Sequence, residues 1–546
     1  MRYTLTVAAL LAMVGATLSA CGGGGGGRGT SSETVAPPAQ LPAVDVSRIA
    51  ANDPGSTLPE HWEAGAVMQI YVRGYQDSDG DGIGDLRGLI QRLDYLQALG
   101  VRGIWLMPVT RSSDRDHGYA VADYRDIESD YGSLADFDAL LAQAHARGIA
   151  VIVDYVMNHS ADTHPLFVNA KAGPANAYRS WYVWQDPAPA NWRIYGIDPW
   201  HATRTGAYYG AFSTQMPDFN LRNPDVVAWH KDNLRFWLNR GVDGIRFDAV
   251  GNLFENGPAN LVDQPENYAL MGDMRTLVTS YQRRFMVSEA PVDPIGFGSL
   301  GPGSSAFAFQ HQTDILAAAR GDQSAAARVA GYFPAAPLTM STMLANHDSF
   351  AGTRVWNQLD GNDAQYRLAA ATYLLQPGTP FIYYGEEIGM STAPLPGDPG
   401  LRAPMSWSAD GKTAGFTTGT PFRALASNAA VRNVAAQSAD PGSLLSFYKA
   451  MLALRNTRPS IARGNYVQPK AEGAVVSFRR ELDGEATLVV INYGSASAQA
   501  NVEGLPPGAV LQRLYPSAGA ADMAADAAGH AGVVAPGQSV QVYRLR

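Results

Sequence analysis

The stretch "GIRFDAV" (residues 244–250) places Arg246 and Asp248 two positions apart inside an apolar run that predicts a β-strand. Alternate residues of a strand point to opposite sides, so these two charges share one side. Unpaired charges are costly to bury, which leaves two interpretations. In one, the pair is a structural salt bridge. In the other, the strand end opens into a polar cleft, where Arg246 lowers the pKa of Asp248 and keeps it ionised as a nucleophile.

Two more carboxylates stand at the ends of strand-like runs. Glu289 lies in "RFMVSEA" (284–290), and Asp348 lies in "TMLANHDS" (342–349). The intervals along the chain fit one β/α unit between Asp248 and Glu289 and two units between Glu289 and Asp348. Because the carboxyl ends of barrel strands share one face, the three carboxylates would meet there. Glycoside cleavage requires such a set: one carboxylate attacks the anomeric carbon, and a protonated carboxyl donates to the leaving oxygen.

The elements that must position these residues alternate in type from about residue 62, with short apolar runs followed by longer amphipathic stretches. Helices are predicted at 85–100, at 133–148 and from residue 223. The runs that predict strands are 66–72, 103–109, 149–157, 244–250, 284–290, 306–310, 342–349 and 379–385, of which 306–310 is the least strand-like. Eight such repeats predict an α/β fold, the (β/α)₈ TIM barrel.

The barrel does not account for the whole chain. We expect the catalytic barrel to span residues 58–465, with a small subdomain inserted after strand 3 at about 160–222, a stretch rich in Trp, Tyr, Pro and Gly. From residue 466 the pattern changes to short alternating strands such as "AVVSFRREL" and "SVQVYRLR". Residues 466–546 are therefore predicted to form a C-terminal antiparallel β-sandwich domain.

The N-terminus has the pattern of an export signal. Residues 1–20 carry Arg2 and a short apolar run that ends in "LSAC", which resembles the lipobox of bacterial lipoproteins. We expect lipidation of Cys21, the only cysteine of the chain, and a flexible Gly/Ser/Pro tether over 21–57. The alternative is a plain secretory signal with an incidental cysteine. The lipoprotein hypothesis predicts an exported protein held to a bacterial membrane by its lipid alone, facing the periplasm or the cell surface.

The charge balance limits the ligand. The formal net charge is −9, which argues against nucleic acid because its phosphates favour a basic surface. A neutral or weakly polar ligand fits better. We expect no organic cofactor and a monomer.

Six ordered motifs give the chain a specific resemblance to a known family. They are "DYVMNH" (154–159), "MPDFN" (216–220), "GIRFDAV" (244–250), "VSEA" (287–290), "ANHDS" (345–349) and "GTPFIYYGEEIGM" (378–390). The chain resembles the α-amylase family of glycoside hydrolases, family thirteen, over almost everything after residue 60. "MPDFN" is similar to the intermediate group between oligo-1,6-glucosidases and neopullulanases.

The resemblance implies a role for each motif residue. Asp248 would be the nucleophile, Glu289 the general acid/base with a pKa raised so that it stays protonated near neutrality, and Asp348 the transition-state stabiliser. The residues implied in substrate binding are Asp116, Tyr119, His159, Arg246, His347 and Arg402. Taken singly, each histidine would more often be structural. One departure is that the Lys-His pair common after the nucleophile motif is replaced by Gly251 and Asn252.

The loop "DSDGDGIGD" (77–85) suggests a cation site. Acidic residues at alternate positions offer the hard oxygen ligands that Ca²⁺ prefers, although a solvated acidic turn is the alternative. The loop resembles the single-metal loop of oligo-1,6-glucosidase-like relatives. The ligands implied for a structural Ca²⁺ are the side chains of Asp77, Asp79, Asp81 and Asp85 and the carbonyl of Ile83.

The sequence as a whole predicts a retaining glycoside hydrolase acting on α-glucan oligosaccharides. Ala249, directly after the nucleophile, favours α-1,4 bonds in maltooligosaccharides and starch-type glucans, since relatives that prefer α-1,6 bonds tend to carry Val there. Transglycosylation is common in the resembling group. The alternatives are an α-glucosidase or a sucrose- or trehalose-converting transglycosylase of the same family, and a non-catalytic glucan-binding lipoprotein.

Overall fold

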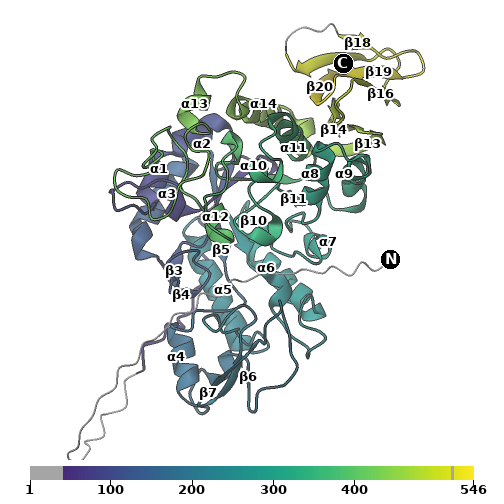
Figure 1. Cartoon of the computed structure of the whole chain (residues 1–546). Coiled ribbons are helices and arrows are strands. Elements are labelled where there is room, and N and C mark those ends of the chain that lie inside the picture. Colours follow the sequence, from purple (N-terminus) through teal and green to yellow (C-terminus); the bar gives the residue numbers. More distant parts are fainter. Residues whose placement is uncertain (1–40, 518–521) are drawn as a thin grey trace, which may run out of the picture.

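A computed structural model describes residues 41–517 and 522–546 (Figure 1). The predicted signal peptide, Cys21 and the first part of the predicted tether lie outside these residues. Within the described residues, no helix combines the length and the apolarity needed to span a bilayer.

The core of the protein is a parallel sheet with strand order β10-β9-β5-β2-β1-β12-β11. Its strands are β1 (Val67–Ile70), β2 (Gly103–Leu106), β5 (Ala150–Tyr155), β9 (Gly244–Phe247), β10 (Phe285–Ser288), β11 (Ser341–Thr342) and β12 (Thr379–Tyr383). Ala306 and Phe307 close the ring, since Ala306 pairs in parallel with Ser288 and Phe307 with Ser341. The sheet is therefore the predicted (β/α)₈ barrel, with residues 306–307 in the sixth strand position.

Two predicted elements differ from the structure. The strand predicted at 342–349 is wrong beyond Thr342, because the chain leaves the sheet there and places Asp348 on a loop. The single helix predicted at 85–100 is two helices, α1 (Leu86–Gln91) and α2 (Leu93–Leu99), which meet at Arg92. Arg92 donates to Gln76 Oε1 at 2.7 Å and lies over the Trp407 ring, contacts that accompany the break.

The barrel is filled by apolar side chains and surrounded by helices. Inward residues of several strands form one buried cluster that includes Trp105, Ile152, Val287, Phe307 and Phe381. The helices that surround the sheet are α1, α2, α3 (Leu134–His145), α5 (Pro224–Asn239), α6 (Pro265–Thr279), α8 (His311–Ala319), α9 (Gln323–Ala335), α11 (Asp363–Leu375) and α14 (Leu444–Thr457). Shorter helices in the loops are α4 (Pro165–Ala172), α7 (Pro294–Gly298), α10 (Val355–Gln358), α12 (Asp398–Leu401), α13 (Val434–Ser438) and α15 (Pro459–Arg463).

Two insertions rise from the carboxyl ends of the strands. The first is a hairpin of β3 (Thr110–Ser112) and β4 (Val121–Ile127), which carries Asp116 and Tyr119 in its turn. The second, after β5, contains α4 and a small sheet of β6 (Trp184–Gln185), β7 (Trp200–Thr203) and β8 (Gly206–Tyr209). It lies at the bottom of Figure 1 and ends where α5 begins.

The C-terminal residues form a two-layered antiparallel domain, seen at the upper right of Figure 1. One layer holds β13 (Asn465–Glu472), β14 (Val475–Leu482), β15 (Glu485–Asn492), β17 (Val510–Tyr515), β18 (Met523–Ala524) and β20 (Ser539–Leu545). The other layer holds β16 (Ala498–Val502) and β19 (Ala531–Ala535). A buried apolar cluster that includes Leu488, Val502 and Val533 fills the space between them.

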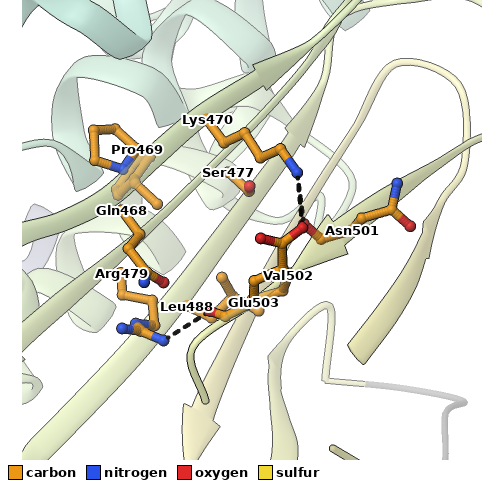
Figure 2. A pocket seen from close by; sticks show the side chains of 10 residues that line it. Gln468, Pro469, Lys470, Ser477, Arg479, Leu488, Asn501, Val502 and Glu503 are labelled. Atoms are coloured by element: carbon orange, nitrogen blue, oxygen red, sulfur yellow. Dashed lines mark hydrogen bonds and ion pairs between the residues drawn. The ribbon is translucent and has the colours of Figure 1, made fainter. Parts of the chain in front are cut away.

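A cavity of about 260 Å³ opens in this domain, as Figure 2 shows. Its charged side chains are already engaged: Arg479 donates to the carbonyl oxygens of Glu503 and Gly504, and Lys470 pairs with Glu503 and with Glu472 at 2.9 Å. The cavity is built from C-terminal strands and carries none of the strand-end carboxylates of the barrel.

Residues 41–57 are docked on the barrel. Trp229 and Asn239 of α5 donate to the carbonyl oxygens of Asp45 and Ala50, and Arg284 donates to that of Gly55. We predicted this stretch as the end of a flexible tether, and that part of the prediction is wrong because α5 supplies fixed donors to its backbone.

Candidate active site

Arg246 is the centre of the carboxylate cluster at the mouth of the barrel. It is 1% exposed, and its Nη1 donates to Asp248 Oδ1 and to Asp154 Oδ1, each at 2.7 Å. Its Nη2 donates to Glu289 Oε2, also at 2.7 Å. Carboxylates from β5 and from the residues directly after β9 and β10 thus converge on one guanidinium. Two carboxylates held by the two ends of one guanidinium fit the close spacing, about 5 Å, of retaining glycosidases.

Burial changes the predicted protonation of Asp248. We expected Arg246 to lower the pKa of Asp248, but desolvation outweighs the guanidinium and, together with the charges of Glu289 and Asp154, raises that pKa well above its usual value. Desolvation likewise raises the pKa of Asp154 to about 6. Adjacent negative charges repel, so burial and the neighbouring carboxylates both favour the protonated form of Asp248.

The backbone after Asp248 is held in an uncommon conformation. Ala249 has φ +47° and ψ +41°, in the left-handed region that a residue with a Cβ rarely adopts. Its N–H donates to Glu289 Oε2 at 3.0 Å, so the same oxygen accepts from Arg246 and from Ala249. Both bonds fall on Oε2, and no N–H of the described residues donates to Oε1 of Glu289.

Asp348 lies at the other side of the cluster, on the loop after β11. Arg402 donates to Asp348 Oδ1 at 3.0 Å and to the carbonyl oxygen of His347 at 3.1 Å. Desolvation raises the pKa of Asp348 to about 7 although Arg402 acts in the opposite direction.

His347 and Tyr119 connect this loop to the centre of the barrel. His347 Nδ1 lies 2.6 Å from Gln69 Nε2, which can only donate, so the neutral ring carries its proton on Nε2. That nitrogen lies 2.7 Å from the Tyr119 hydroxyl and 3.1 Å from Asp348 Oδ2. Tyr119 also donates to Asp154 Oδ2 at 3.0 Å. The network fixes the positions of the acids before a ligand binds.

His159 has an unused polar atom. Desolvation lowers the pKa of this 2%-exposed imidazole to about 3, so the ring is neutral. Its Nε2 is buried and finds no partner among the described residues. Buried polar atoms are normally paired, and an unpaired one beside a cleft is suited to a ligand hydroxyl.

Asp116 lies further from the centre. Its Oδ1 accepts from the Tyr71 hydroxyl at 2.6 Å and from Arg423 Nη2 at 2.8 Å. Burial opposes its ionisation, but the charges of Arg423 and Arg402 lower its pKa overall. Asp116 is thus a fixed carboxylate at the edge of the cluster.

Comparison with known proteins identifies the family. Residues 69–464 match the family described as alpha amylase, catalytic domain. The chain belongs to the α-amylase family of glycoside hydrolases. It is 31% identical to a probable alpha-glucosidase of Rhizobium meliloti (84% of this chain and 92% of that protein) and 33% identical to a trehalose synthase/amylase of Mycobacterium tuberculosis (80% and 82%). The crystal structure of a trehalulose synthase from Pseudomonas mesoacidophila is similar with a TM-score of 0.75 and 26% identity, over 89% of this chain and 99% of that one.

This α-amylase-family barrel also carries the predicted acidic loop after β1. Carboxylate oxygens of Asp77, Asp79 and Asp85 lie within 4.8 Å of one another, whereas Asp81 stands outside this group and accepts from the Ile83 N–H at 2.7 Å. Asp77 is buried, yet hydrogen bonds from Thr417 and from backbone amides lower its pKa. Three ionisable carboxylates so close together fit a hard cation such as Ca²⁺.

Sequence reasoning missed two members of the cluster. Asp154 was recognised only as part of a motif, yet it shares Arg246 with Asp248 and also accepts from Trp105 Nε1 at 3.2 Å. The inward position of Asp154 on a buried strand was an available signal. Arg423 gave none, because it reaches Asp116 from a distant loop.

Proposed function

We propose that the protein is a retaining α-glucosidase-type enzyme that cleaves α-1,4 bonds of maltooligosaccharides. The observation that carries the proposal is the sharing of Arg246 by Asp248 and Glu289, with Asp348 held opposite by Arg402. Two carboxyls held side by side on one guanidinium fit the acid and the nucleophile that retention needs.

In the proposed mechanism, Asp248 attacks the anomeric carbon while Glu289 protonates the leaving oxygen through Oε1. A covalent glucosyl-Asp248 intermediate forms, and the ionised Glu289 then takes a proton from water, which releases glucose with retained configuration. Asp348 and the free Nε2 of His159 bind ring hydroxyls, and Asp348 favours the positive charge that develops on the sugar.

The charged side chains beyond the sugar site support action at a chain end. Arg402 pairs with Asp348 and Asp398, and Arg423 pairs with Asp116, so ion pairs line the part of the site where Asp348 lies. We propose that this wall limits the site to one glucose unit on that side, as an α-glucosidase requires. A starch-degrading endo-enzyme would need an open groove there.

The test is the time course of products from maltoheptaose. We expect glucose and maltohexaose first, with the glucose released as the α-anomer by NMR. Release of β-glucose would exclude retention, and early internal fragments would exclude action at the chain end.

A second candidate is transfer of glucose between sugars, as in sucrose- or trehalose-converting enzymes. It is favoured by the relative named trehalose synthase/amylase and by the solved trehalulose synthase. Incubation with maltose, sucrose and trehalose separates the two functions, since a transferase yields a new disaccharide in excess of free glucose.

We also propose that the acidic loop binds one Ca²⁺ through Asp77, Asp79 and Asp85, with Asp81 and the Ile83 carbonyl joining when the ion is bound. Bound ion would hold the β1 loop in place. Chelator should lower the apparent melting temperature of the wild type. In the Asp79→Asn variant the decrease caused by chelator should be much smaller. An equal response in both would exclude this loop.

We further propose export and attachment through a lipid on Cys21, on the basis of the lipobox-like "LSAC". Labelling of cells with a radioactive fatty acid should mark the wild type and leave the Cys21→Ser variant unmarked. Label on both proteins would exclude the anchor.

A further inference from the structure

The loop after β9 and the inserted subdomain meet beside the proposed acid. Tyr195 of the inserted subdomain donates to Asn252 Oδ1 at 2.9 Å. Asn252 ends η5 (Val250–Asn252), the turn that follows Asp248, and the Val250 N–H in that turn donates to the Glu289 carbonyl oxygen at 3.2 Å. The contact therefore lies beside Glu289.

Tyr195 offers a ring face to this side. It is 49% exposed, and its ring stacks on Phe212 at 5.7 Å, while Phe212 in turn packs against His159 at 5.3 Å. Its φ of +52° is uncommon for a residue with a large side chain. An exposed aromatic ring held by a stack and a hydrogen bond suits the apolar face of a sugar ring.

Two polar groups next to Tyr195 lack partners. Asn252 is only 7% exposed, and its Nδ2 finds no acceptor among the described residues. Asp263 is half-buried, and its Oδ2 likewise finds no donor there. A buried donor and a buried acceptor left open at one place point to a ligand that supplies both kinds of hydrogen bond, as a sugar hydroxyl does.

The lack of a side chain at Gly251 lets the Asp263 carboxylate lie close to the turn that follows Asp248. A Cβ at Gly251 would lie 2.6 Å from Asp263 Oδ1, closer than atoms in contact allow. The Asp263 N–H donates to the Gly251 carbonyl oxygen at 2.8 Å, which holds the two residues together. A side chain at 251 would displace this carboxylate, so the glycine lets Asp263 present an acceptor beside the turn.

We propose that Tyr195, Asn252 and Asp263 form the subsite for the sugar on the leaving side of the cleaved bond. The sugar ring stacks on Tyr195, Asn252 Nδ2 donates to it, and Asp263 accepts from its hydroxyls. The subsite takes a neutral sugar or polyol. This inference rests on the proposed function, because it assumes that Glu289 protonates the bond to that sugar.

Two substrates separate this subsite from the catalytic centre. Maltose fills it with glucose, whereas α-D-glucosyl fluoride has the same glucosyl group and no sugar on the leaving side. For Tyr195→Ala, Asn252→Ala and Asp263→Asn we expect at least a tenfold loss of kcat/KM on maltose and less than a threefold loss on the fluoride. Tyr195→Phe keeps the aromatic ring, so its kcat/KM on maltose should fall less than that of Tyr195→Ala.

The controls keep the outcomes distinct. Asp94→Asn, on the surface of α2, should change kcat/KM by less than twofold on either substrate. Equal losses of kcat/KM on both substrates, or no loss on maltose, would contradict the proposed subsite. A wild type that does not hydrolyse the fluoride would instead overturn the proposed function. Tyr195→Ala alters an exposed side chain, so this variant should fold and can be measured even if Asn252→Ala does not fold.

Discussion

Two groups of buried carboxyls in this barrel are held by different partners. At the mouth, Asp248 and Glu289 share Arg246, and Asp348 pairs with Arg402. At the end of β12, Glu386 accepts from the hydroxyls of Tyr373 and Tyr448, and Glu387 accepts from that of Tyr95. Within the part of the chain that the structure describes, neither Glu386 nor Glu387 has an arginine, lysine or histidine nitrogen within 4 Å of its carboxylate.

This difference in partners shows which surroundings suit a buried carboxyl to catalysis. Desolvation raises the pKa of Glu386 to about 7, and its partners are neutral, so it is held as a structural acid. The mouth carboxyls are also desolvated, but Arg246 and Arg402 act against that desolvation and favour the ionised form of Asp248 and Asp348. The arginines thereby stabilise a carboxylate at the mouth, whereas the tyrosine hydroxyls around Glu386 bring no positive charge.

The largest expected contrast is in activity. Asp248→Asn should lower kcat on α-D-glucosyl fluoride by at least about 10³-fold, or ~4 kcal/mol, because an amide cannot attack the anomeric carbon. Glu386→Gln, a matched change of a buried carboxyl, should lower it by less than threefold. A large loss in both variants would show that the tyrosine-held carboxyl also takes part in the reaction.

The next contrast concerns the positive charge of Arg246. Arg246→Met leaves Asp154, Asp248 and Glu289 without their shared partner, and breaking a buried ion pair typically costs about 3–5 kcal/mol. We expect a lower apparent melting temperature at pH 8, with partial recovery at pH 5 because the orphaned carboxyls can then take up protons. A melting temperature equal to that of the wild type at pH 8 would mean that the guanidinium does not offset their charge.

A smaller effect should appear in the pH dependence of activity. Burial raises the pKa of Asp348 to about 7 and also raises that of Asp248 well above its usual value, and the mechanism uses the ionised form of both. The acidic limb of kcat/KM on α-D-glucosyl fluoride should therefore lie near pH 7 or above. A plateau that continues down to pH 4.5, near the ordinary carboxyl value, would contradict the raised pKa values.

The smallest effect concerns stability. Glu386 has a folded pKa of about 7 against 4.5 when unfolded, so the folded state binds more protons and stability falls as pH rises from about 4.5 to 7. Glu386→Gln cannot ionise, so its loss of unfolding free energy between pH 5 and pH 8, measured by denaturant titration, should be smaller than that of the wild type by about 1–3 kcal/mol. An equal loss would assign the pH dependence to other groups.

The prediction from sequence was best where local pattern decides the structure. Apolar runs predicted the barrel, and strand-end position brought Asp248 and Glu289 to one mouth. It was worst where distant segments meet. The pairing of Arg423 with Asp116, the break at Arg92 beneath Trp407 and the protonation of Asp248 all depend on contacts or burial that no local pattern contains.

The docked segment 41–57 has a consequence for the proposed anchor. Because α5 and Arg284 hold this segment by its backbone, only about 20 residues separate Cys21 from it, and a chain of that length spans at most about 70 Å when fully extended. If Cys21 carries the proposed lipid, this docked segment at α5 would therefore set how far the barrel can stand from the bilayer.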